Sequence, residues 1–324
     1  MKAKVAINGF GRIGKNMLRI WLENPDKMEI VAINSTSGPK AHAHLFKYDS
    51  IYGVLNNDID STDDTIVIDG KPINFFSERD PEKLPWAELD VDIVIESTGF
   101  FRSKKDAIKH LNAGAKRVII TAPGDEVDKT IVMGINEKDF NPVEDYIISS
   151  ASCTTNCLAP VVKVIDENLG IKNGSLSTIH AYTADQRLVD KPHKDLRRAR
   201  GAALSIIPTT TGAAKAIGLI MPHLNGKLNG SAFRVPTEAV SMVDFVANVD
   251  KATTKEELNE LFKKASKGEL KGILDFTEAP LVSRDLVKDS HSSIVDGLST
   301  MVIDETVVKV MAWYDNEYGY ATRV

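Results

Sequence analysis

The sequence predicts an α/β protein in two parts: a doubly wound parallel sheet, followed by an α+β domain on a large mixed or antiparallel sheet. Two observations predict this fold class. In the first half, short apolar runs alternate with helical patterns, as in a parallel sheet covered by helices. After about residue 150 the strand patterns become longer and alternate between apolar and polar residues. The length of 324 residues fits two domains of about 150 residues each.

The first half begins with a short apolar strand at Lys4–Asn8, and a helix with apolar residues near helical spacing follows at Arg12–Glu23. Near-continuous apolar runs, typical of buried parallel strands, come later in this half. The remaining elements are expected at Glu29–Asn34, Val91–Thr98, Lys104–Ala113 and Arg117–Pro123.

The second half contains strands with one exposed face and a well-marked helix. That helix begins at Thr254 with a capping box to Glu257 and ends at Gly268. The boundary between the domains is expected near Ala151, which gives a first domain at 1–151 and a second at 152–315. The strands are expected at Leu176–Thr183, Ser231–Val235, Val240–Val249 and Thr306–Tyr314.

Composition excludes several classes of protein. A net charge of −5 argues against a protein that mainly binds nucleic acid. The sequence has no apolar stretch of about 18 residues, the length that a membrane span needs. The two cysteines, Cys153 and Cys157, exclude a disulfide framework and lack neighbouring zinc ligands. We therefore expect a reduced, cytoplasmic setting and no metal. The nearby pair His42 and His44 is expected on a helix or loop surface.

A glycine-rich loop connects the first strand to the first helix. Gly9 permits a tight turn, Gly11 lets the backbone approach a pyrophosphate, and Gly14 allows the helix to pack closely on the strand. The helix N-terminus then faces the anion. This spacing alone is weak evidence, but its position between a strand and a helix predicts a Rossmann-type dinucleotide-binding domain.

The residue after the second strand bears on the choice between NAD and NADP. An Asp or Glu is expected there, to bind the ribose 2′-hydroxyl, but the sequence has Ser35. A carboxylate would repel a 2′-phosphate, whereas a serine can donate a hydrogen bond to it. Thr36, Ser37 and Lys40 add further donors. The pattern favours NADP acceptance; the alternative is that Ser35 only caps a turn and NAD is used.

Cys153 is expected at or just before a helix N-terminus, where the helix dipole favours a thiolate. Cys157, one turn later, is expected to point into the core. Pro160 either fits the first turn of this helix or kinks it. Free cysteines are more often small buried hydrophobes than nucleophiles, so the residues around Cys153 must decide its role.

Those residues, with the glycine loop, resemble the phosphorylating glyceraldehyde-3-phosphate dehydrogenase family over essentially the whole chain. The hexapeptide Ser152–Cys157 is the most specific of the matching motifs. The others are Asn8–Gly14, Lys47–Ser50, Ser97–Phe101, His180–Thr183, Asp195–Arg200, Pro208–Lys215, Arg234–Pro236 and Trp313–Gly319.

The resemblance implies a covalent mechanism for the oxidation of glyceraldehyde 3-phosphate. Cys153 would add to the aldehyde carbon, and His180 would take the hemithioacetal proton as hydride leaves for the nicotinamide. The backbone N–H of Cys153 is an expected oxyanion donor. Inorganic phosphate would then attack the thioester and release an acyl phosphate, in a reversible reaction.

The resemblance also implies two anion sites. Thr183 and Arg234 match the substrate-phosphate site, and Arg198 matches the arginine between the two sites. Taken alone, the arginines of this region are as well explained by ion pairs with Asp185, Asp190 and Asp195. The inorganic-phosphate site is matched by Ser152, Thr154, Thr211 and Gly212.

Further matches concern the cofactor and the assembly. Asn316 matches the residue that holds the nicotinamide carboxamide, and the segment 316–324 is expected to return to the cofactor domain. Lys191 matches a residue that approaches the adenosine from a neighbouring subunit of a homotetramer; a lysine there favours NADP, but the following Pro192 favours NAD. The other cofactor positions are Arg12, Ile13, Asn34, Arg79, Thr98 and Thr121.

Two other functions remain open at this point. The related erythrose-4-phosphate dehydrogenase hydrolyses its thioester instead of passing it to phosphate, but Thr209–Gly212 and Asp195–Arg200 favour the phosphate-using enzyme. A binding protein with a vestigial site is disfavoured because the predicted catalytic and phosphate-binding residues are present together.

Overall fold

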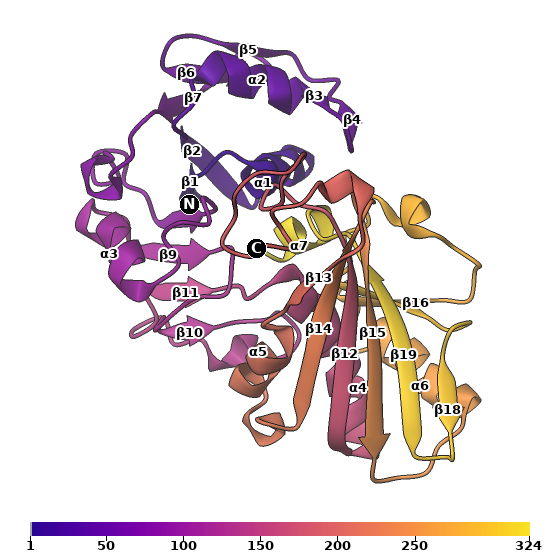
Figure 1. Cartoon of the computed structure of the whole chain (residues 1–324). Coiled ribbons are helices and arrows are strands. Elements are labelled where there is room, and N and C mark those ends of the chain that lie inside the picture. The colour runs from indigo at the N-terminus through magenta and orange to yellow at the C-terminus, as the bar shows by residue number, and fades with distance from the viewer. Residues whose placement is uncertain (1) are drawn as a thin grey trace. The chain divides into compact units, whose positions relative to one another are not determined.

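The computed structural model describes residues 2–324, and the chain divides into two compact units. The first comprises the residues up to Ile131, Asp139–Ala151 and Val324, and the second comprises Val132–Lys138 and Ser152–Arg323. Met1, the first residue of the predicted cofactor domain, lies outside the described residues. Each unit has its own sheet and its own helices (Figure 1), and each is described below by itself.

The first unit contains a sheet with the strand order β10-β11-β9-β8-β1-β2-β7-β6-β5. Pairing is parallel from β10 to β7 and antiparallel at β6 and β5. This doubly wound sheet confirms the predicted fold of the first half. Its strands are β1 (Ala3–Asn8), β2 (Met28–Asn34), β5 (Ile59–Ser61), β6 (Thr65–Ile68), β7 (Lys71–Phe76), β8 (Ile93–Glu96), β9 (Arg117–Ile120), β10 (Lys129–Thr130) and β11 (Ile147–Ser149).

Three helices connect strands of this sheet: α1 (Arg12–Glu23), α2 (Pro39–Lys47) and α3 (Lys104–Asn112). A small hairpin follows α2, with β3 (Tyr48–Asp49) and β4 (Gly53–Val54). The strand β8 is shorter than the apolar run that predicted it. The reason is local. The Ser97 hydroxyl donates to the carbonyl oxygen of Gly9, and the Thr98 N–H donates to the Glu96 carboxylate. Gly99 then has a positive φ of 74°. The chain therefore turns away at the carboxyl end of the strand.

The second unit is built on a mixed sheet with the order β13-β14-β12-β15-β19-β17-β16, and β18 pairs with β19. Most neighbours are antiparallel, but β12 pairs with β14, and β16 with β17, in parallel. The predicted mixed sheet is thus confirmed. Its strands are β12 (Ile171–Ala181), β13 (Ile207–Thr210), β14 (Leu228–Val235), β15 (Ser241–Val249), β16 (Leu274–Thr277), β17 (Ser293–Asp296), β18 (Met301–Ile303) and β19 (Val307–Tyr314).

The helix α4 (Cys153–Leu169) packs against β15, β17 and β19 (Figure 1). An apolar face of Leu158, Val161, Val162 and Ile165, each 0% exposed, buries this helix in the core of the unit. Pro160 lies inside α4 and not in its first turn. The other helices are α5 (Ala213–Ile220), α6 (Lys255–Lys267) and α7 (Tyr318–Arg323).

The helix α6 shows the predicted capping box. Thr254 accepts a hydrogen bond from the Glu257 N–H at 3.2 Å, and the Glu257 carboxylate accepts one from the Thr254 N–H at 3.0 Å. Gly268 is its C-cap. The short helix α7 contacts α4 and is grouped with the second unit up to Arg323. The predicted return of residues 316–324 to the cofactor domain stays a prediction.

Short 3₁₀ turns complete the two units, at Pro81–Lys83, Glu137–Asp139, Ala202–Leu204, Pro222–Leu224 and Ser283–Leu286. Among residues 2–324, no helix combines the length and the apolar character that a membrane span requires.

Candidate active site

Cys153 is the first residue of α4, and the sequence at this point explains why the helix begins there. Ser152 has extended backbone angles and caps the helix, because its Oγ accepts a hydrogen bond from the Thr155 N–H at 3.0 Å. The thiol of Cys153 is therefore held at a helix N-terminus, as predicted. Cys157, one turn later, is fully buried, with its thiol near Ser293 Oγ and the carbonyl oxygens of Ala312 and Trp313.

His180 faces this thiol from the end of β12. The distance from Cys153 Sγ to His180 Nε2 is 3.4 Å. Because β12 and β14 pair in parallel with His180 opposite Arg234, the guanidinium lies on the other side of the imidazole. Arg234 Nη1 is 2.6 Å from His180 Nδ1 and 3.0 Å from the carbonyl oxygen of Ala181. The structure thus brings three predicted residues together in one unit.

The contacts at His180 Nδ1 require opposite tautomers of a neutral imidazole. The Ala181 carbonyl oxygen, at 2.7 Å, can only accept a hydrogen bond from an Nδ1–H, whereas the arginine can only donate a hydrogen bond to an unprotonated Nδ1. With the proton on Nδ1, Nε2 has a free lone pair toward the thiol. With the proton on Nε2, the imidazole donates to the sulfur. The site accommodates both proton arrangements that an acid–base histidine adopts in turn.

Burial and the arginine determine the charge of the pair. Burial raises the pKa of the Cys153 thiol, while the charge of Arg234 and hydrogen bonds from Thr154 lower it. Burial, and then the charge of Arg234, lowers the pKa of His180 to about 3. At neutral pH the imidazole is therefore neutral, and the thiol keeps its proton, because the rise in its pKa on burial exceeds the opposing effects.

The first unit contains a cavity of about 670 Å³ at the carboxyl ends of β1, β2 and β8. This is where the strand order reverses, since β2 and β8 lie on opposite sides of β1. Doubly wound sheets bind their ligands at such a point. Six of the predicted cofactor residues line the cavity: Gly9, Gly11, Asn34, Ser35, Arg79 and Thr98.

The predicted turn at Gly9 and the close packing at Gly14 are confirmed, and the role of Gly11 toward a pyrophosphate stays a prediction. Gly9 has a φ of +97°, and a Cβ there would lie 2.5 Å from the Thr98 nitrogen. A Cβ on Gly14 would lie 2.4 Å from the carbonyl oxygen of Gly9, so α1 packs directly on the loop. At Gly11 a Cβ would meet nothing within 4 Å. The loop therefore leaves open space at the start of α1, as a pyrophosphate requires, and the residues present fit a dinucleotide.

Comparisons with known proteins decide the family. Residues 3–104 match the model of the glyceraldehyde 3-phosphate dehydrogenase NAD binding domain, and residues 152–316 match that of its C-terminal domain. The chain is 57% identical over 324 residues to glyceraldehyde-3-phosphate dehydrogenase 2 of Trichormus variabilis, which covers 99% of this chain and 96% of that protein.

The chain belongs to the glyceraldehyde-3-phosphate dehydrogenase family. It is also 57% identical to the enzyme of that name from Geobacillus stearothermophilus, over 100% of this chain and 96% of that protein. Identity to glyceraldehyde-3-phosphate dehydrogenase 2 of Bacillus subtilis is 53%, over 100% of this chain and 95% of that protein. The resemblance seen in the sequence is confirmed, and the protein is an NAD(P)-dependent oxidoreductase.

In this dehydrogenase, the other six predicted cofactor residues do not line this cavity: four belong to the first unit and two to the second. The Arg12 guanidinium pairs with the Asp49 carboxylate at 2.6 Å, which leaves its backbone at the α1 N-terminus for an anion. Thr121 caps the end of β9 by donating to the Glu96 carbonyl oxygen at 3.2 Å. Lys191 and Asn316 belong to the second unit. Ile13 and Gly14 lie just behind the loop, in α1.

Two of the predicted phosphate-binding residues take part in other contacts. The Thr154 side chain is buried and lies 2.9 Å from the Tyr314 hydroxyl. Arg198 pairs with Asp185 and Asp195 and donates to Thr209 Oγ1 at 3.0 Å. This is the ion pairing that the sequence left open, yet Arg198 is close enough to lower the pKa of His180.

The remaining predicted phosphate-binding residues lie at turns. Thr183 follows β12, and its N–H donates to Gln186 Oε1 at 3.3 Å. Thr211 and the exposed Gly212 precede α5, where Thr211 Oγ1 accepts from the Ala213 N–H at 3.2 Å. These positions offer hydroxyl groups and backbone N–H groups, the donors that a phosphate needs.

The sequence did not identify two residues that support the site. The ring of Tyr314 packs edge-on against His180, with centroids 5.9 Å apart, and its hydroxyl lies 2.9 Å from both Thr154 Oγ1 and Thr178 Oγ1. Ser241 accepts from the Ala181 N–H at 3.0 Å and donates to Asn316 Oδ1 at 2.9 Å. Tyr314 lies in a family motif, so the motif was a usable signal, but nothing in the sequence singled out Ser241.

The expectation for His42 was wrong. It is 9% exposed and lines the cofactor cavity, whereas His44 is exposed, as predicted. The reason is that the face of α2 with His42, Ala43 and Phe46 is turned inward. The ring of His42 packs between those of Phe10 and Phe75, with centroids 5.6 Å from each.

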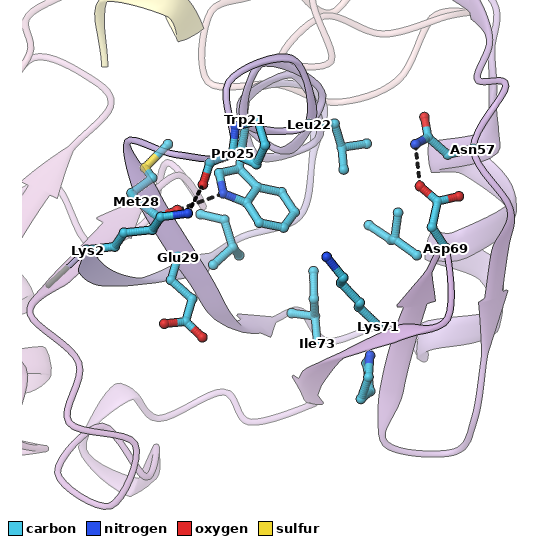
Figure 2. Close-up of a pocket in the computed structure, with 13 residues that line it drawn as sticks. Lys2, Trp21, Leu22, Pro25, Met28, Glu29, Asn57, Asp69, Lys71 and Ile73 are labelled. Carbon is cyan, nitrogen blue, oxygen red and sulfur yellow. Dashed lines mark hydrogen bonds between the residues drawn. The ribbon is translucent and has the colours of Figure 1, made fainter.

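A second hollow of the first unit lies beside the end of α1 and the start of β2 (Figure 2). Trp21, Leu22 and Ile73 contribute apolar side chains to its lining, and the Lys71 side chain extends in among them. None of the predicted site residues lines it. It lies at the amino end of β2, whereas the cofactor cavity lies at the carboxyl end.

Proposed function

We propose that the protein oxidises glyceraldehyde 3-phosphate to 1,3-bisphosphoglycerate, reversibly, with inorganic phosphate and NADP or NAD, through a thioester on Cys153. The observation that carries this proposal is the line of three groups in the second unit: the Cys153 thiol, 3.4 Å from His180 Nε2, with Arg234 against the far side of the same imidazole. A nucleophile, a base and a fixed positive charge are the groups that phosphorylating aldehyde oxidation needs.

In the first step, Cys153 Sγ forms a bond to the aldehyde carbon as the carbonyl π bond breaks, and the thiol proton passes through His180 to the carbonyl oxygen. The oxygen of the resulting hemithioacetal has a proton that His180 Nε2 accepts as the carbon loses hydride. The nicotinamide, when bound, accepts this hydride. The backbone N–H of Cys153, at the N-terminus of α4, is a donor to the oxygen as negative charge develops on it.

The second step transfers the acyl group to phosphate. An oxygen of inorganic phosphate attacks the thioester carbon, the carbon–sulfur bond breaks, and the Cys153 thiolate leaves. The protonated His180 stabilises that thiolate. Ser152, Thr154, Thr211 and Gly212 are proposed for inorganic phosphate, and Thr183, Arg198 and Arg234 for the substrate phosphate.

Arg234 links anion binding to proton transfer. Its charge is the second cause, after burial, of the low pKa of His180. A phosphate dianion beside Arg234 offsets that charge and raises the pKa of His180 toward neutrality. A general base is most effective when its pKa lies near the working pH. Binding of the substrate phosphate thus makes His180 a better base.

The cofactor is proposed to lie on Gly9, Gly11, Arg12, Ile13 and Gly14, with Asn34, Ser35, Arg79, Thr98 and Thr121 around it. Asn316, oriented by its hydrogen bond from Ser241, is proposed for the nicotinamide carboxamide. Acceptance of NADP is supported by Ser35, which offers a hydroxyl where a carboxylate would repel a 2′-phosphate. The proposed domains are 1–151, with 316–324 returning to it, and 152–315.

The proposed assembly is a homotetramer, in which Lys191 approaches the adenosine of a neighbouring subunit. The proposed setting is the cytoplasm, because the mechanism needs Cys153 as a free thiol and both cysteines are unpaired.

The test is a set of initial rates on glyceraldehyde 3-phosphate with NAD and with NADP at matched concentrations. Each is measured with and without inorganic phosphate. We expect a rate that requires phosphate and that Cys153→Ala abolishes. A rate independent of phosphate would instead support thioester hydrolysis, as in erythrose-4-phosphate dehydrogenase. Full activity in Cys153→Ala would contradict the mechanism.

A matched pair of variants tests cofactor choice. Ser35→Asp places a carboxylate at the 2′ position and is expected to shift preference toward NAD by about tenfold or more, since about 1.4 kcal/mol corresponds to a factor of ten. Asn24→Asp adds the same charge at the far end of α1, at an exposed position that does not line the cavity, and is the control. An unchanged preference in Ser35→Asp would show that Ser35 does not discriminate.

A further inference from the structure

His42 has a polar atom whose placement no part of the proposed mechanism explains. The side chain is 9% exposed and lines the cofactor cavity. Its Nε2 lies 2.8 Å from Ser35 Oγ. Its Nδ1 is buried and has no hydrogen-bond partner among the described residues. A buried polar group without a partner is costly, so its persistence beside a binding cavity calls for an explanation.

We propose that His42 is a positioning residue for cofactor selection, which holds the Ser35 hydroxyl as a hydrogen-bond donor toward an acceptor at the ribose 2′ position. The inference rests on the cofactor site proposed above. Ser35 directly follows β2 and lines the cavity, which is the place from which dinucleotide folds contact the ribose 2′ position. What His42 adds is the direction of the Ser35 hydroxyl proton.

The direction follows from the protonation of the imidazole. Burial, and then the charge of Lys15, lowers the pKa of His42 to about 4, so the ring is neutral at physiological pH. A neutral imidazole has a proton on only one nitrogen. A proton on Nδ1 would leave a buried N–H without an acceptor, and buried N–H groups without partners are rarer than buried acceptors without donors. The proton therefore resides on Nε2.

With the proton on Nε2, His42 donates to Ser35 Oγ. The hydroxyl proton of Ser35 is then not used by the histidine and can be donated to another acceptor. A phosphate oxygen at the 2′ position is the better acceptor, because hydrogen bonds to charged groups are stronger than those between neutral groups. In the opposite tautomer, the Ser35 hydroxyl would donate to His42 Nε2. Toward the ribose, Ser35 could then only accept a hydrogen bond, which would favour a 2′-hydroxyl. The arrangement thus favours a 2′-phosphate.

The ring is held so that this hydrogen bond keeps its geometry. Phe10 packs against one side of His42 and Phe75 against another, with interplanar angles of 65° and 36°. Lys15, the charged neighbour from α1, is itself fixed: its Nζ donates to the Phe10 carbonyl oxygen at 3.0 Å. Burial lowers the pKa of Lys15 to about 8.

The test measures binding of two cofactor fragments that differ only at the 2′ position, adenosine 2′,5′-bisphosphate and 5′-AMP. Titration calorimetry on the full-length protein gives the ratio of their affinities without any chemistry. His42→Leu keeps the apolar volume and removes the donor. It is expected to lower the preference for the bisphosphate by about 3- to 10-fold, the range that one hydrogen bond contributes.

Three further variants make the test specific. His42→Gln restores a side-chain N–H donor and is expected to keep most of the preference. His44→Leu, on the exposed face of the same helix, is the matched control and is expected to leave the ratio unchanged. In a Ser35→Ala background, His42→Leu is expected to have no further effect on the ratio, because the two residues act through one hydroxyl.

The outcomes separate this inference from the proposed function. The inference is overturned if His42→Leu weakens the binding of both fragments by the same factor, or if it raises the preference for the bisphosphate. This holds whichever fragment the unaltered protein prefers. If the unaltered protein binds 5′-AMP more tightly, the proposed NADP acceptance is contradicted.

Discussion

At the scale of single residues, the proposed chemistry depends on how burial and one arginine set the proton affinities of two side chains. Burial alone would leave Cys153 a poor nucleophile, since the thiolate is the reactive form. The nearby charge of Arg234 opposes the rise in the thiol pKa and adds to the fall in the pKa of His180. The same guanidinium is proposed to hold the substrate phosphate, so substrate binding and proton affinity are coupled through one residue.

Arg234→Gln tests this coupling through alkylation of Cys153 by iodoacetamide, followed as a function of pH without cofactor or phosphate. Alkylation becomes faster as the pH rises through the thiol pKa, because only the thiolate reacts. Removing a positive charge raises that pKa, so the profile of Arg234→Gln is expected to lie at higher pH. At neutral pH the variant should react several-fold more slowly.

Arg200→Gln is the control for this experiment, because Arg200 is exposed and pairs with Asp190 at 2.9 Å. Its profile is expected to match that of the unaltered protein. A profile of Arg234→Gln that moves to lower pH would show that Arg234 does not stabilise the thiolate.

At the scale of elements, strand ends and helix starts position the functional groups. Beneath the cofactor cavity, the buried Glu96 at the end of β8 accepts hydrogen bonds from the Asn8 side chain, from His110 Nε2 at 3.1 Å and from the Thr98 N–H at 2.8 Å. Trp86 Nε1 donates to His110 Nδ1 at 3.0 Å, which places the imidazole proton on Nε2, toward Glu96. One carboxylate thus joins β1, β8 and α3.

Glu96→Gln is expected to lower the free energy of unfolding of the protein by about 2–3 kcal/mol, because the new amide N–H₂ faces donors and leaves buried groups unpaired. Weaker binding of 5′-AMP should accompany this loss, since Asn8 and Thr98 line the cavity. Denaturant unfolding and calorimetry measure the two effects. Unchanged stability would mean that the network contributes little.

Thr254→Ala is the matching prediction for an element remote from the proposed site residues. Loss of the capping box at α6 is expected to cost about 1 kcal/mol of stability. The kcat and KM values for glyceraldehyde 3-phosphate should stay unchanged, because no predicted site residue lies in α6. Reduced turnover in this variant would contradict the prediction, because it would show that α6 is coupled to the proposed site.

At the scale of the whole molecule, the segment 182–206, between β12 and β13, exposes several large apolar side chains. Leu188 is 81% exposed, Leu196 79% and Leu204 82%. Large apolar side chains exposed along one segment favour an interface with another protein chain. This surface supports the proposed homotetramer, in which the segment would be covered.

Leu204→Glu places a charge on that surface, and it is expected to shift the protein toward smaller species in size-exclusion chromatography with light scattering. The unaltered protein should elute at four times the mass of one chain. Val282→Glu, a charge at another exposed apolar residue outside the segment, with 60% exposure, is the control. An unaltered protein that is monomeric at micromolar concentration would contradict the tetramer.

The sequence by itself determined the local elements and pointed to the proposed reacting groups. Hydrophobic period, glycine spacing and capping residues act over a few neighbouring positions, so α1, the cap at Thr254 and the start of α4 at Cys153 could all be read from the chain. Family motifs supplied the role of His180, which no local pattern could have indicated.

Only the tertiary structure decided which groups meet. The parallel pairing of β12 with β14 sets Arg234 against His180, and the orientation of α2 turns His42 toward Ser35 and away from solvent. Tyr314 and Ser241 became part of the site for the same reason. Strand register and helix orientation come from the packing of the whole core, because free energy is gained only when distant apolar faces are buried together, and no short stretch of sequence contains that information.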